Sequence, residues 1–366
     1  MKITILGSGN GGTTIAADLT VKGHSITLLK TSNRASENFK YLLDNDGLVT
    51  FKDIEEEHTV NIYKVTDSYE EAFSENPELI IVFINTNYHE ATIKRMAPYL
   101  RDNQVILLEP GYLSTAYYKK YCGDKELIIA EAESSPIDCR VTAPGQARAL
   151  FKNIRNPIGI YPIKRKDEGM AVLDQLGYNF KLLDSVVEAA MHNPNLIVHT
   201  IGAIMSIPRI EYFEGDYWMY REVFTASVWN LVKRLDNEKM NVLQALGLEP
   251  MPYEKACRYR NSEDLSVNAK EAFFDYAKND SPSGPTESNS RYITEDVPQG
   301  LVLLESMGRV LNIKTPVCSS LIEIASACLD TDFRKGGRTV KRLGKSILSE
   351  IMGEFSSRMS DSITYI

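Results

Sequence analysis

Cysteine is scarce in this sequence, and the few cysteines are scattered. The 366 residues include five of them, at positions 122, 139, 257, 318 and 328, and no two form a CxxC pair. An odd, dispersed set of thiols argues against a disulfide framework and against a zinc site, so we expect neither, and no metal. Apolar residues make up 43% of the chain, which is enough for ordinary hydrophobic cores.

An excess of positive charge and long apolar runs are also missing. The chain has 41 basic and 49 acidic residues, a formal net charge of −8, and a pI of about 5.4. Nucleic acids and anionic membranes attract basic surfaces, so neither is expected as a partner. The N-terminal run KITIL meets glycine too soon for a signal sequence, and no later run reaches membrane-spanning length. We therefore expect a soluble cytoplasmic protein.

The length predicts two domains, and the first half alternates strand-like and helical segments. The strand-like runs KITILG, SITLLK, LIIVFI, QVILLE and LIIAEA are short, apolar and rich in β-branched residues, as doubly buried strands are. Amphipathic stretches lie between them, which predicts an α/β fold with a doubly wound parallel sheet of the Rossmann type. We expect LVTFKDIEEEHTVNIYKV to form an extra hairpin or strand pair, and IGIYPI and FKLLDS two further strands.

From about residue 186 the periodicity becomes helical. VVEAAMHNPNLIVHTIGAIMSI, REVFTASVWNLVKRLDNEKMNVLQALG and GLVLLESMGRVLNI are long and helix-spaced. We predict an NAD(P)-binding domain at 1–185 and an all-helical domain at 186–366. His192 and His199 are seven residues apart and would lie two turns apart on one face of a continuous helix. The Ser-, Pro- and Gly-rich segment 277–290 interrupts the helices, and we expect a mobile loop of functional importance there.

The first strand runs directly into a glycine pattern, Gly7-x-Gly9-x-x-Gly12, and a helix follows. Gly7 allows the tight turn, Gly9 lets the backbone approach a pyrophosphate, and Gly12 allows close packing of helix on strand. The helix N-terminus offers N–H groups and a positive dipole end to phosphates. In this context the pattern predicts a dinucleotide site. The residues expected at the cofactor in this turn are Gly7, Ser8, Gly9, Asn10, Gly11 and Gly12.

The second strand lacks the acidic residue that usually binds the ribose 2′-hydroxyl of NAD. The segment there reads LLKTSNR and supplies Lys30, Thr31, Ser32, Asn33 and Arg34 instead. Two cations and several small donors suit a 2′-phosphate, which favours NADP(H) over NAD(H), although NAD(H) is possible. The alternative is that Lys30 and Arg34 are ordinary surface charges.

Residues that follow the later strands are further candidates. Asn85 and Thr86 come after LIIVFI, at the carboxyl end where ligands gather in open α/β sheets, and we expect both at the cofactor. His89 could line the nicotinamide region, but it could equally be a histidine at a helix start. Gly111 ends the next strand region and would allow close approach of the cofactor.

A second cluster of charged residues lies in RYITEDVPQG, residues 291–300. Arg291, Glu295 and Asp296 follow the expected mobile loop and could form one wall of a closing cleft. Alternatively they form an ion pair at a helix start, or Glu295 and Asp296 cap the helix that follows.

Together these segments resemble the opine dehydrogenase family, the octopine/nopaline dehydrogenase group. The resemblance runs in order through ILGSGNGG, NTNYHEATIKRMAPYL, LLEPG, PIDCRV, NPNLIVH, RYITEDVPQGLV, TPVCSSLIEIAS and GRTVKRLG. It implies a Rossmann domain followed by an all-helical domain like the C-terminal domain of 6-phosphogluconate dehydrogenase. It also implies that His199 is the catalytic acid/base, that Asp296 pairs with it, and that Arg291 contacts a substrate carboxylate. Two departures concern the substrate: Thr200 replaces the usual proline, and SPIDCR is less regular than in the family.

The same resemblance implies the reaction. An amino acid and an α-keto acid, most often pyruvate, would condense, and NAD(P)H would reduce the imine to an N-(carboxyalkyl) amino acid. A homodimer is possible. His192 would be structural.

Two other functions compete with this one. A ketopantoate reductase-like or hydroxyacid dehydrogenase-like enzyme would use a helical lysine with an asparagine four residues on, and Lys233 and Asn237 have that spacing. We interpret this pair as part of a solvated helix surface. A non-catalytic NADP-binding sensor would keep the glycine turn without needing His199, Arg291 and Asp296.

Overall fold

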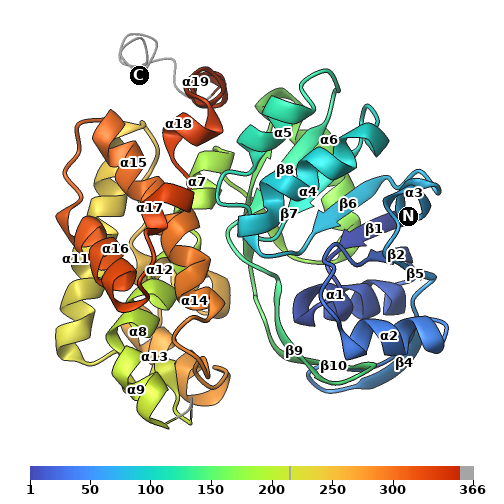
Figure 1. The fold of residues 1–366 in the computed structure, drawn as a ribbon, viewed down its shortest axis with the longest axis horizontal. Coiled ribbons are helices and arrows are strands. Elements are labelled where there is room, and N and C mark those ends of the chain that lie inside the picture. Colours follow the sequence, from blue (N-terminus) through green and yellow to red (C-terminus); the bar gives the residue numbers. More distant parts are fainter. Residues whose placement is uncertain (214–215, 355–366) are drawn as a thin grey trace. The chain divides into compact units, whose positions relative to one another are not determined.

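The computed structural model describes residues 1–213 and 216–354. It divides into two compact units, Met1–Val186 and Val187–Ile366 (Figure 1). The first is built on β-sheets covered by helices, and the second is helical, so the predicted fold class, a Rossmann-type domain followed by an all-helical domain, is confirmed. The sequence prediction puts the division between residues 185 and 186.

The main sheet of the first unit has eight strands among the residues described. Every strand-like run named from the sequence forms one of them. Across the sheet, the strands are β12 (Phe180–Leu182), β11 (Asn156–Tyr161), β8 (Ile128–Ala132), β7 (Val105–Leu108), β6 (Leu79–Val82), β1 (Lys2–Leu6), β2 (Ser25–Leu29) and β5 (Lys64–Thr66). β1 lies between β6 and β2, so the chain order reverses beside the glycine turn, which is where open α/β sheets bind ligands.

The sheet departs from the predicted parallel arrangement at one edge, where β11 and β12 run opposite to the other strands. β11 pairs with β8 in the antiparallel direction, with Ile158 opposite Ala132, and β12 then runs parallel to β11. Parallel neighbours need a crossover connection, usually a helix. Between β8 and β11 the chain instead forms a hairpin, β9 (Ile137–Ala143) and β10 (Gln146–Lys152), which the sequence analysis did not predict.

A second, four-stranded sheet contains this hairpin, in the order β4-β3-β10-β9. The strand pair predicted in LVTFKDIEEEHTVNIYKV is confirmed as the antiparallel strands β3 (Leu48–Lys52) and β4 (Glu57–Asn61). Residues 64–66 of the same region leave it and join the main sheet as β5. The two sheets are thus built from interleaved segments of the chain.

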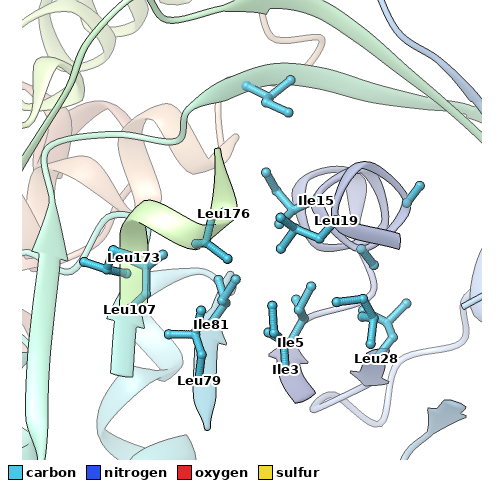
Figure 2. Close-up of a cluster of buried hydrophobic side chains, with 14 of the residues drawn as sticks. Ile3, Ile5, Ile15, Leu19, Leu28, Leu79, Ile81, Leu107, Leu173 and Leu176 are labelled. Carbon is cyan, nitrogen blue, oxygen red and sulfur yellow. The ribbon is translucent and has the colours of Figure 1, made fainter. Parts of the chain in front are cut away.

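Helices α1 and α6 lie on the face of the main sheet that carries the cluster in Figure 2. α3 lies on the opposite face, where its Ala72 carbonyl accepts a bond from the Thr4 hydroxyl of β1. The helices and turns of this unit are α1 (Asn10–Val21), α2 (Glu37–Asp44), α3 (Tyr69–Phe73), η1 (Thr86–Tyr88), α4 (His89–Met96), η2 (Ala97–Tyr99), α5 (Thr115–Tyr121), η3 (Ile163–Arg165), α6 (Lys166–Leu173) and η4 (Asp174–Leu176).

α1 is enclosed on all sides, which fixes the direction of its N-terminus. It contacts β1 and β2 of the main sheet and β9, β10 and β3 of the second sheet. Eight consecutive residues, Gly12 to Leu19, are buried, a pattern typical of a helix with no solvent face. Ile15 and Leu19 pack over Ile3, Ile5 and the neighbouring strands (Figure 2).

The second unit contains helices and no strand among residues 187–213 and 216–354. Their bounds are α7 (Val186–Met191), η5 (Pro194–Leu196), α8 (Val198–Met205), α9 (Ile207–Phe213), α10 (Met219–Glu222), α11 (Ala226–Ala245), α12 (Tyr253–Asn261), α13 (Ala269–Asn279), α14 (Arg291–Thr294), η6 (Val297–Leu301), α15 (Val302–Val310), α16 (Pro316–Cys328), α17 (Phe333–Gly336), α18 (Val340–Leu343) and α19 (Lys345–Gly353).

The expectation of one continuous helix through both histidines is wrong. α7 ends at Met191, before His192, and α8 begins at Val198, before His199. Between them the Asn193 side chain accepts a bond from the Asn195 N–H and starts the short turn η5. Pro194 lacks an N–H and disfavours a helical conformation for the residue before it, so the NPN sequence breaks the helix. The two imidazoles are therefore not on one helical face.

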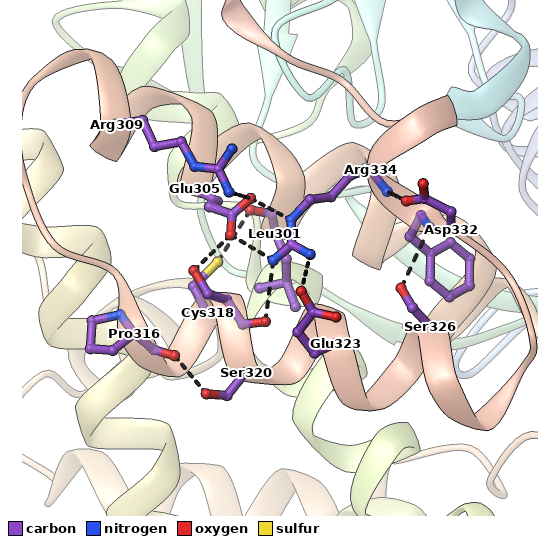
Figure 3. Close-up of polar contacts among 12 residues, drawn as sticks. Leu301, Glu305, Arg309, Pro316, Cys318, Ser320, Glu323, Ser326, Asp332 and Arg334 are labelled. Atoms are coloured by element: carbon purple, nitrogen blue, oxygen red, sulfur yellow. Dashed lines mark hydrogen bonds and ion pairs between the residues drawn. The ribbon is translucent and has the colours of Figure 1, made fainter.

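A buried carboxylate ties α15, α16 and α17 together (Figure 3). The Glu305 carboxylate accepts bonds from Arg334 Nε at 2.8 Å and from Ser319 Oγ at 2.6 Å, and pairs with Arg309. Burial acts to raise the pKa of Glu305, but the bonds from Arg334 and Ser319 outweigh it, and the pKa is lowered. These contacts fix the helices that follow the π-helical turn η6.

No helix in the described ranges combines the length and apolar composition needed to cross a bilayer.

A second buried carboxyl group lies at the end of β7. Glu109 is 2% exposed, and neither of its carboxyl oxygens has a hydrogen-bond partner. Burial raises its pKa to about 8. Because water cannot solvate the charged form there, the carboxyl group is held mainly in its neutral form at neutral pH.

Glu109 should therefore make stability depend on pH. Its pKa in the folded chain lies above the ordinary value of 4.5, so the folded state binds the extra proton and stability falls as pH rises between these two values. Relative to Glu109→Gln, we expect wild-type stability to fall by about 3 kcal/mol between about pH 5 and about pH 7.5. Denaturant titrations of both proteins across this range measure the difference, and a constant difference contradicts the prediction.

Candidate functional site

The glycine turn between β1 and α1 has the geometry that the sequence predicts. Gly7 has φ +114°, a conformation that favours glycine, and a Cβ there would overlap the Phe83 carbonyl oxygen. A Cβ on Gly12 would overlap the Gly7 carbonyl oxygen, so the close approach of helix to turn is also confirmed. A Cβ on Gly9 would meet nothing within 4 Å, which leaves open space beside the backbone there.

Two asparagines hold this turn in place. The Asn10 side chain accepts a 2.9 Å bond from the Val141 N–H, which joins the start of α1 to β9. Asn38 of α2 donates to Thr13 Oγ1 at 3.0 Å and accepts from the Gly145 N–H at 3.0 Å. Sequence reasoning missed Asn38 because it belongs to no motif and contacts the turn only through the tertiary fold.

The loop after β2 gathers the expected cations. The Lys30 ammonium group bonds to the Ser32 carbonyl, which closes the loop on itself. Arg34 is exposed and lies 3.5 Å from the Tyr88 hydroxyl. Arg95 of α4 adds a cation that the sequence analysis missed, since it donates to the Thr31 carbonyl at 3.2 Å. The structure therefore places three positively charged side chains around residues 30–34.

The structure places the candidate residues after β6 and β7 in different surroundings. Asn85 starts the turn η1 by accepting a bond from the Asn87 N–H at 3.0 Å, and Thr86 is buried in that turn. His89 is 1% exposed, with its ring nitrogens 2.8 Å from Ser114 Oγ and 3.2 Å from the Ile84 carbonyl, so it fits the helix-start interpretation. A Cβ on Gly111 would overlap the Glu131 carboxylate, so the close neighbour that this glycine accommodates is Glu131.

In the second unit, folding brings His199 and Asp296 together. The Nδ1 atom of His199 lies 2.8 Å from Asp296 Oδ2, and the two residues are 5% and 1% exposed. His199 is in the first turn of α8, while Asp296 directly precedes η6, a π-helical turn of the kind often found at functional sites. A buried carboxylate at Nδ1 sets the tautomer of a histidine, orients its ring and stabilises the imidazolium.

The other charged residues of RYITEDVPQG have mixed roles. Arg291 pairs with Glu295 one helical turn on, at 3.5 Å, as an ordinary ion pair would. The Arg291 side chain is nevertheless 57% exposed. Asp296 makes no side-chain bond to the N–H groups of η6, so the capping alternative is wrong for it.

Matches to protein-family models cover parts of both units. Residues 182–329 match the NAD/NADP octopine/nopaline dehydrogenase alpha-helical domain, and residues 3–135 match ketopantoate reductase PanE/ApbA. The first match contains both His199 and Asp296.

Whole-chain comparisons give a more specific result. The chain is 28% identical to an opine dehydrogenase of Arthrobacter sp. (strain 1C) over 354 residues, which covers 94% of this chain and 95% of the relative. The chain is opine dehydrogenase-like. A structure of octopine dehydrogenase with NADH and agmatine matches its fold with a TM-score of 0.77 at 17% identity, covering 96% and 98% of the two chains. NADP⁺-bound yersinopine dehydrogenase matches with a TM-score of 0.71 at 14% identity, covering 100% and 97%.

These matches confirm the resemblance found in the sequence. The protein is an NAD(P)-dependent oxidoreductase that acts on CH–NH donors. Its glycine turn fits the cofactor, because the space at Gly9 and the N-terminus of α1 are what a pyrophosphate requires.

His192, which lies directly before the NPNLIVH segment, has surroundings that fit a structural role. His192 is 4% exposed, and its Nδ1 lies 3.3 Å from the ammonium group of buried Lys239. Burial, and then the charges of Lys239 and Arg260, lower the pKa of His192 well below its usual value. A histidine held neutral between cations is poorly suited to carry a proton, which agrees with the structural role expected for it.

Two aromatic residues of the helical unit have packing roles. Tyr217 and Tyr220 are 1% and 7% exposed, and Tyr220 stacks with Phe224, so both belong to the core. Within the predicted mobile loop, the Gly284 N–H donates to the Tyr217 carbonyl at 2.9 Å. The mobility of this loop stays a prediction.

Two glycine variants separate cofactor binding from folding. Gly9→Ala places its methyl group in the space predicted for the pyrophosphate, so we expect ~10-fold weaker NADPH binding. Its stability should change by no more than about 1 kcal/mol, the scale of a helix-cap substitution. Gly12→Ala instead forces its methyl group against backbone and should cost about 3 kcal/mol.

Fluorescence titration with NADPH and thermal unfolding measure the two effects. Unchanged NADPH binding by Gly9→Ala would show that the pyrophosphate does not lie there.

Proposed function

We propose that this protein catalyses the NAD(P)H-dependent reductive condensation of an amino acid with an α-keto acid. The observation that supports this most directly is the buried 2.8 Å contact between His199 and Asp296. It lies within the segment that matches the octopine/nopaline dehydrogenase helical domain. A catalytic acid/base needs such a partner, whereas a nucleotide sensor does not.

His199 would move the protons. Its Nδ1 is engaged by Asp296, so exchange with substrate would take place at Nε2. The imidazole would first take a proton from the ammonium group of the amino acid, which frees the amine to add to the keto carbon. The imidazolium would then return the proton to the hydroxyl group of the adduct, which leaves as water. Asp296 would stabilise the imidazolium between these two steps.

The bound cofactor would supply the hydride that reduces the imine carbon. Gly7, Gly9 and Gly12 with the N-terminus of α1 would hold its pyrophosphate, while Asn85, Thr86 and Gly111 would lie near its nicotinamide half. The side chain of Arg291 would grip a substrate carboxylate as a two-pronged donor. Its 57% exposure is compatible with that role, although the ion pair with Glu295 would have to share the guanidinium.

We further propose that NADP(H) is preferred over NAD(H). Lys30, Arg34 and Arg95 surround a loop without a carboxylate in the position that would bind a ribose 2′-hydroxyl. A 2′-phosphate would bring two negative charges to these cations. Arginine and backbone N–H groups are the usual ligands of such a phosphate.

We propose pyruvate as the keto acid. The residues named above do not identify the amino acid. Octopine dehydrogenase, which shares this fold, has been solved with NADH and L-arginine and with pyruvate. We propose action in the cytoplasm, and a homodimer stays a prediction.

The ketopantoate reductase-like alternative is less well supported. Lys233 and Asn237, its proposed pair, are both exposed on α11. The buried lysine of that helix is Lys239, which pairs with Asp236 at 2.7 Å and so serves the core. The family match to ketopantoate reductase covers the first unit, whereas the helical unit matches octopine/nopaline dehydrogenases.

A pair of variants tests the catalytic assignment. His199→Ala should lower turnover by about 10²- to 10⁴-fold, because the proton carrier is lost. Its NADPH affinity should stay near the wild-type value. Lys233→Ala should remain fully active, whereas the ketopantoate reductase-like alternative requires it to be inactive.

The assay follows NADPH and NADH oxidation with pyruvate and pools of amino acids. Wild-type protein that oxidises neither cofactor with any pool would favour the sensor. Equal activity of His199→Ala and wild type would remove His199 from the mechanism.

A third variant tests the cofactor preference. Arg34→Ala should weaken NADPH binding by about 10- to 100-fold, the value of a hydrogen bond to a charged group. NADH binding should not change, because NADH lacks the 2′-phosphate. Lys40→Ala, another exposed cation nearby on α2, serves as the control. Equal losses for both cofactors would contradict a 2′-phosphate site at Arg34.

A further inference from the structure

Tyr292 lies flat against the imidazole of His199. The two ring centroids are 3.7 Å apart and the planes differ by 5°. Tyr292 is on α14 and is 8% exposed, while His199 is on α8 and is 5% exposed. The contact therefore joins two helices in a buried setting.

The geometry of this stack bears on whether the His199 ring is neutral or protonated. Two neutral aromatic rings prefer an offset or edge-to-face arrangement, usually with centroids 4.5–7 Å apart, because the electron-rich faces repel each other. The centroid distance of 3.7 Å between these nearly parallel planes is shorter than that range. A cation over the face of a tyrosine is attracted by the same electron density. The stack thus suits an imidazolium better than a neutral imidazole.

We propose that Tyr292 is a positioning residue that stabilises the protonated form of His199 through its ring face. Asp296 binds the edge of the imidazole at Nδ1, and Tyr292 covers one of its faces. The two contacts favour the same charge state and together fix the ring plane. The catalytic meaning of this role rests on the proposed function, in which His199 passes through the imidazolium between two proton transfers.

The other charged groups near the pair act in both directions. The negative charge of Glu295, which directly follows α14, would favour the imidazolium. The positive charge of Arg291 on α14, whose guanidinium carbon lies 5.8 Å from the Tyr292 ring centroid, would disfavour it. On the other elements packed on α8, the buried titratable groups are engaged elsewhere. They are Asp236 paired with Lys239 and Glu238 bonded to the Cys318 N–H on α11, Cys318 bonded to the Leu301 carbonyl on α16, and Tyr220 stacked on Phe224 on α10.

The expected effect is a shift in the pH at which the His199 ring titrates. Tyr292→Leu removes the π face and keeps an apolar side chain, so the midpoint should fall by about 0.5 to 1.5 pH units. Tyr292→Phe keeps the face and loses only the hydroxyl group, so its midpoint should stay close to wild type.

The titration is followed by NMR on the full chain labelled with ¹³C at the histidine Cε1 atoms. The chain has five histidines, and His199→Gln identifies the His199 signal by its loss. A series of increasingly fluorinated phenylalanines at position 292 withdraws density from the ring face while its shape is kept. The midpoint should fall stepwise through that series, which gives a test even if Tyr292→Leu does not fold.

An unchanged midpoint across the fluorinated series would overturn the proposal. So would a shift in Tyr292→Phe as large as that in Tyr292→Leu, or a wild-type ring that stays neutral throughout. Because the titration needs no substrate, its result is independent of whether pyruvate and an amino acid turn over. The titration therefore distinguishes failure of the stacking proposal from failure of the proposed function.

Discussion

The helical unit depends on a buried hydrogen bond between two residues that lie 97 positions apart in the chain, His199 and Asp296. Removing either partner would break this bond inside a buried setting, which costs free energy of unfolding. The surrounding structure is arranged to keep both in place. The break at Pro194 lets α8 begin just before His199, and η6 begins just after Asp296.

The turn η6 needs support of its own, because a π-helical turn disrupts the regular pattern of backbone bonds. Two of its carbonyl groups accept bonds from outside the turn. Pro298 accepts from the Arg338 N–H at 2.8 Å, and Leu301 accepts from Cys318 Sγ at 3.2 Å. The Glu305 contacts in Figure 3 hold α16, which carries Cys318, and α17, which ends two residues before Arg338. An irregular segment beside the candidate site is thus stabilised by its neighbours.

Burial alone does not decide what a titratable group can do. His192 and His199 are both almost completely buried. Burial, and then the neighbouring cation of Lys239, lower the pKa of His192, whereas His199 lies beside the carboxylate of Asp296. Glu109 has neither kind of partner, so burial raises its pKa to about 8. The neighbouring charge therefore distinguishes His199, the candidate proton carrier, from His192 and Glu109.

The sequence alone determined the strands of the main sheet other than β5, the glycine turn and the helical character of the second unit. These are local properties, since apolar runs, glycines and helical spacing act between residues close in the chain. Together with the family resemblance, the sequence also indicated that His199 and Asp296 would pair. It did not reveal the β9–β10 hairpin, the antiparallel β11, or the break between α7 and α8, although Pro194 was a local signal for that break.

Only the tertiary structure decided the contacts between distant segments. Asn38 holds the glycine turn, Arg95 joins the loop after β2, and Tyr292 stacks on His199. No sequence pattern predicts the partner of any of these three residues, because each contact depends on how separate elements pack. The charge state of a buried group is decided in the same way, by neighbours that the chain order does not identify.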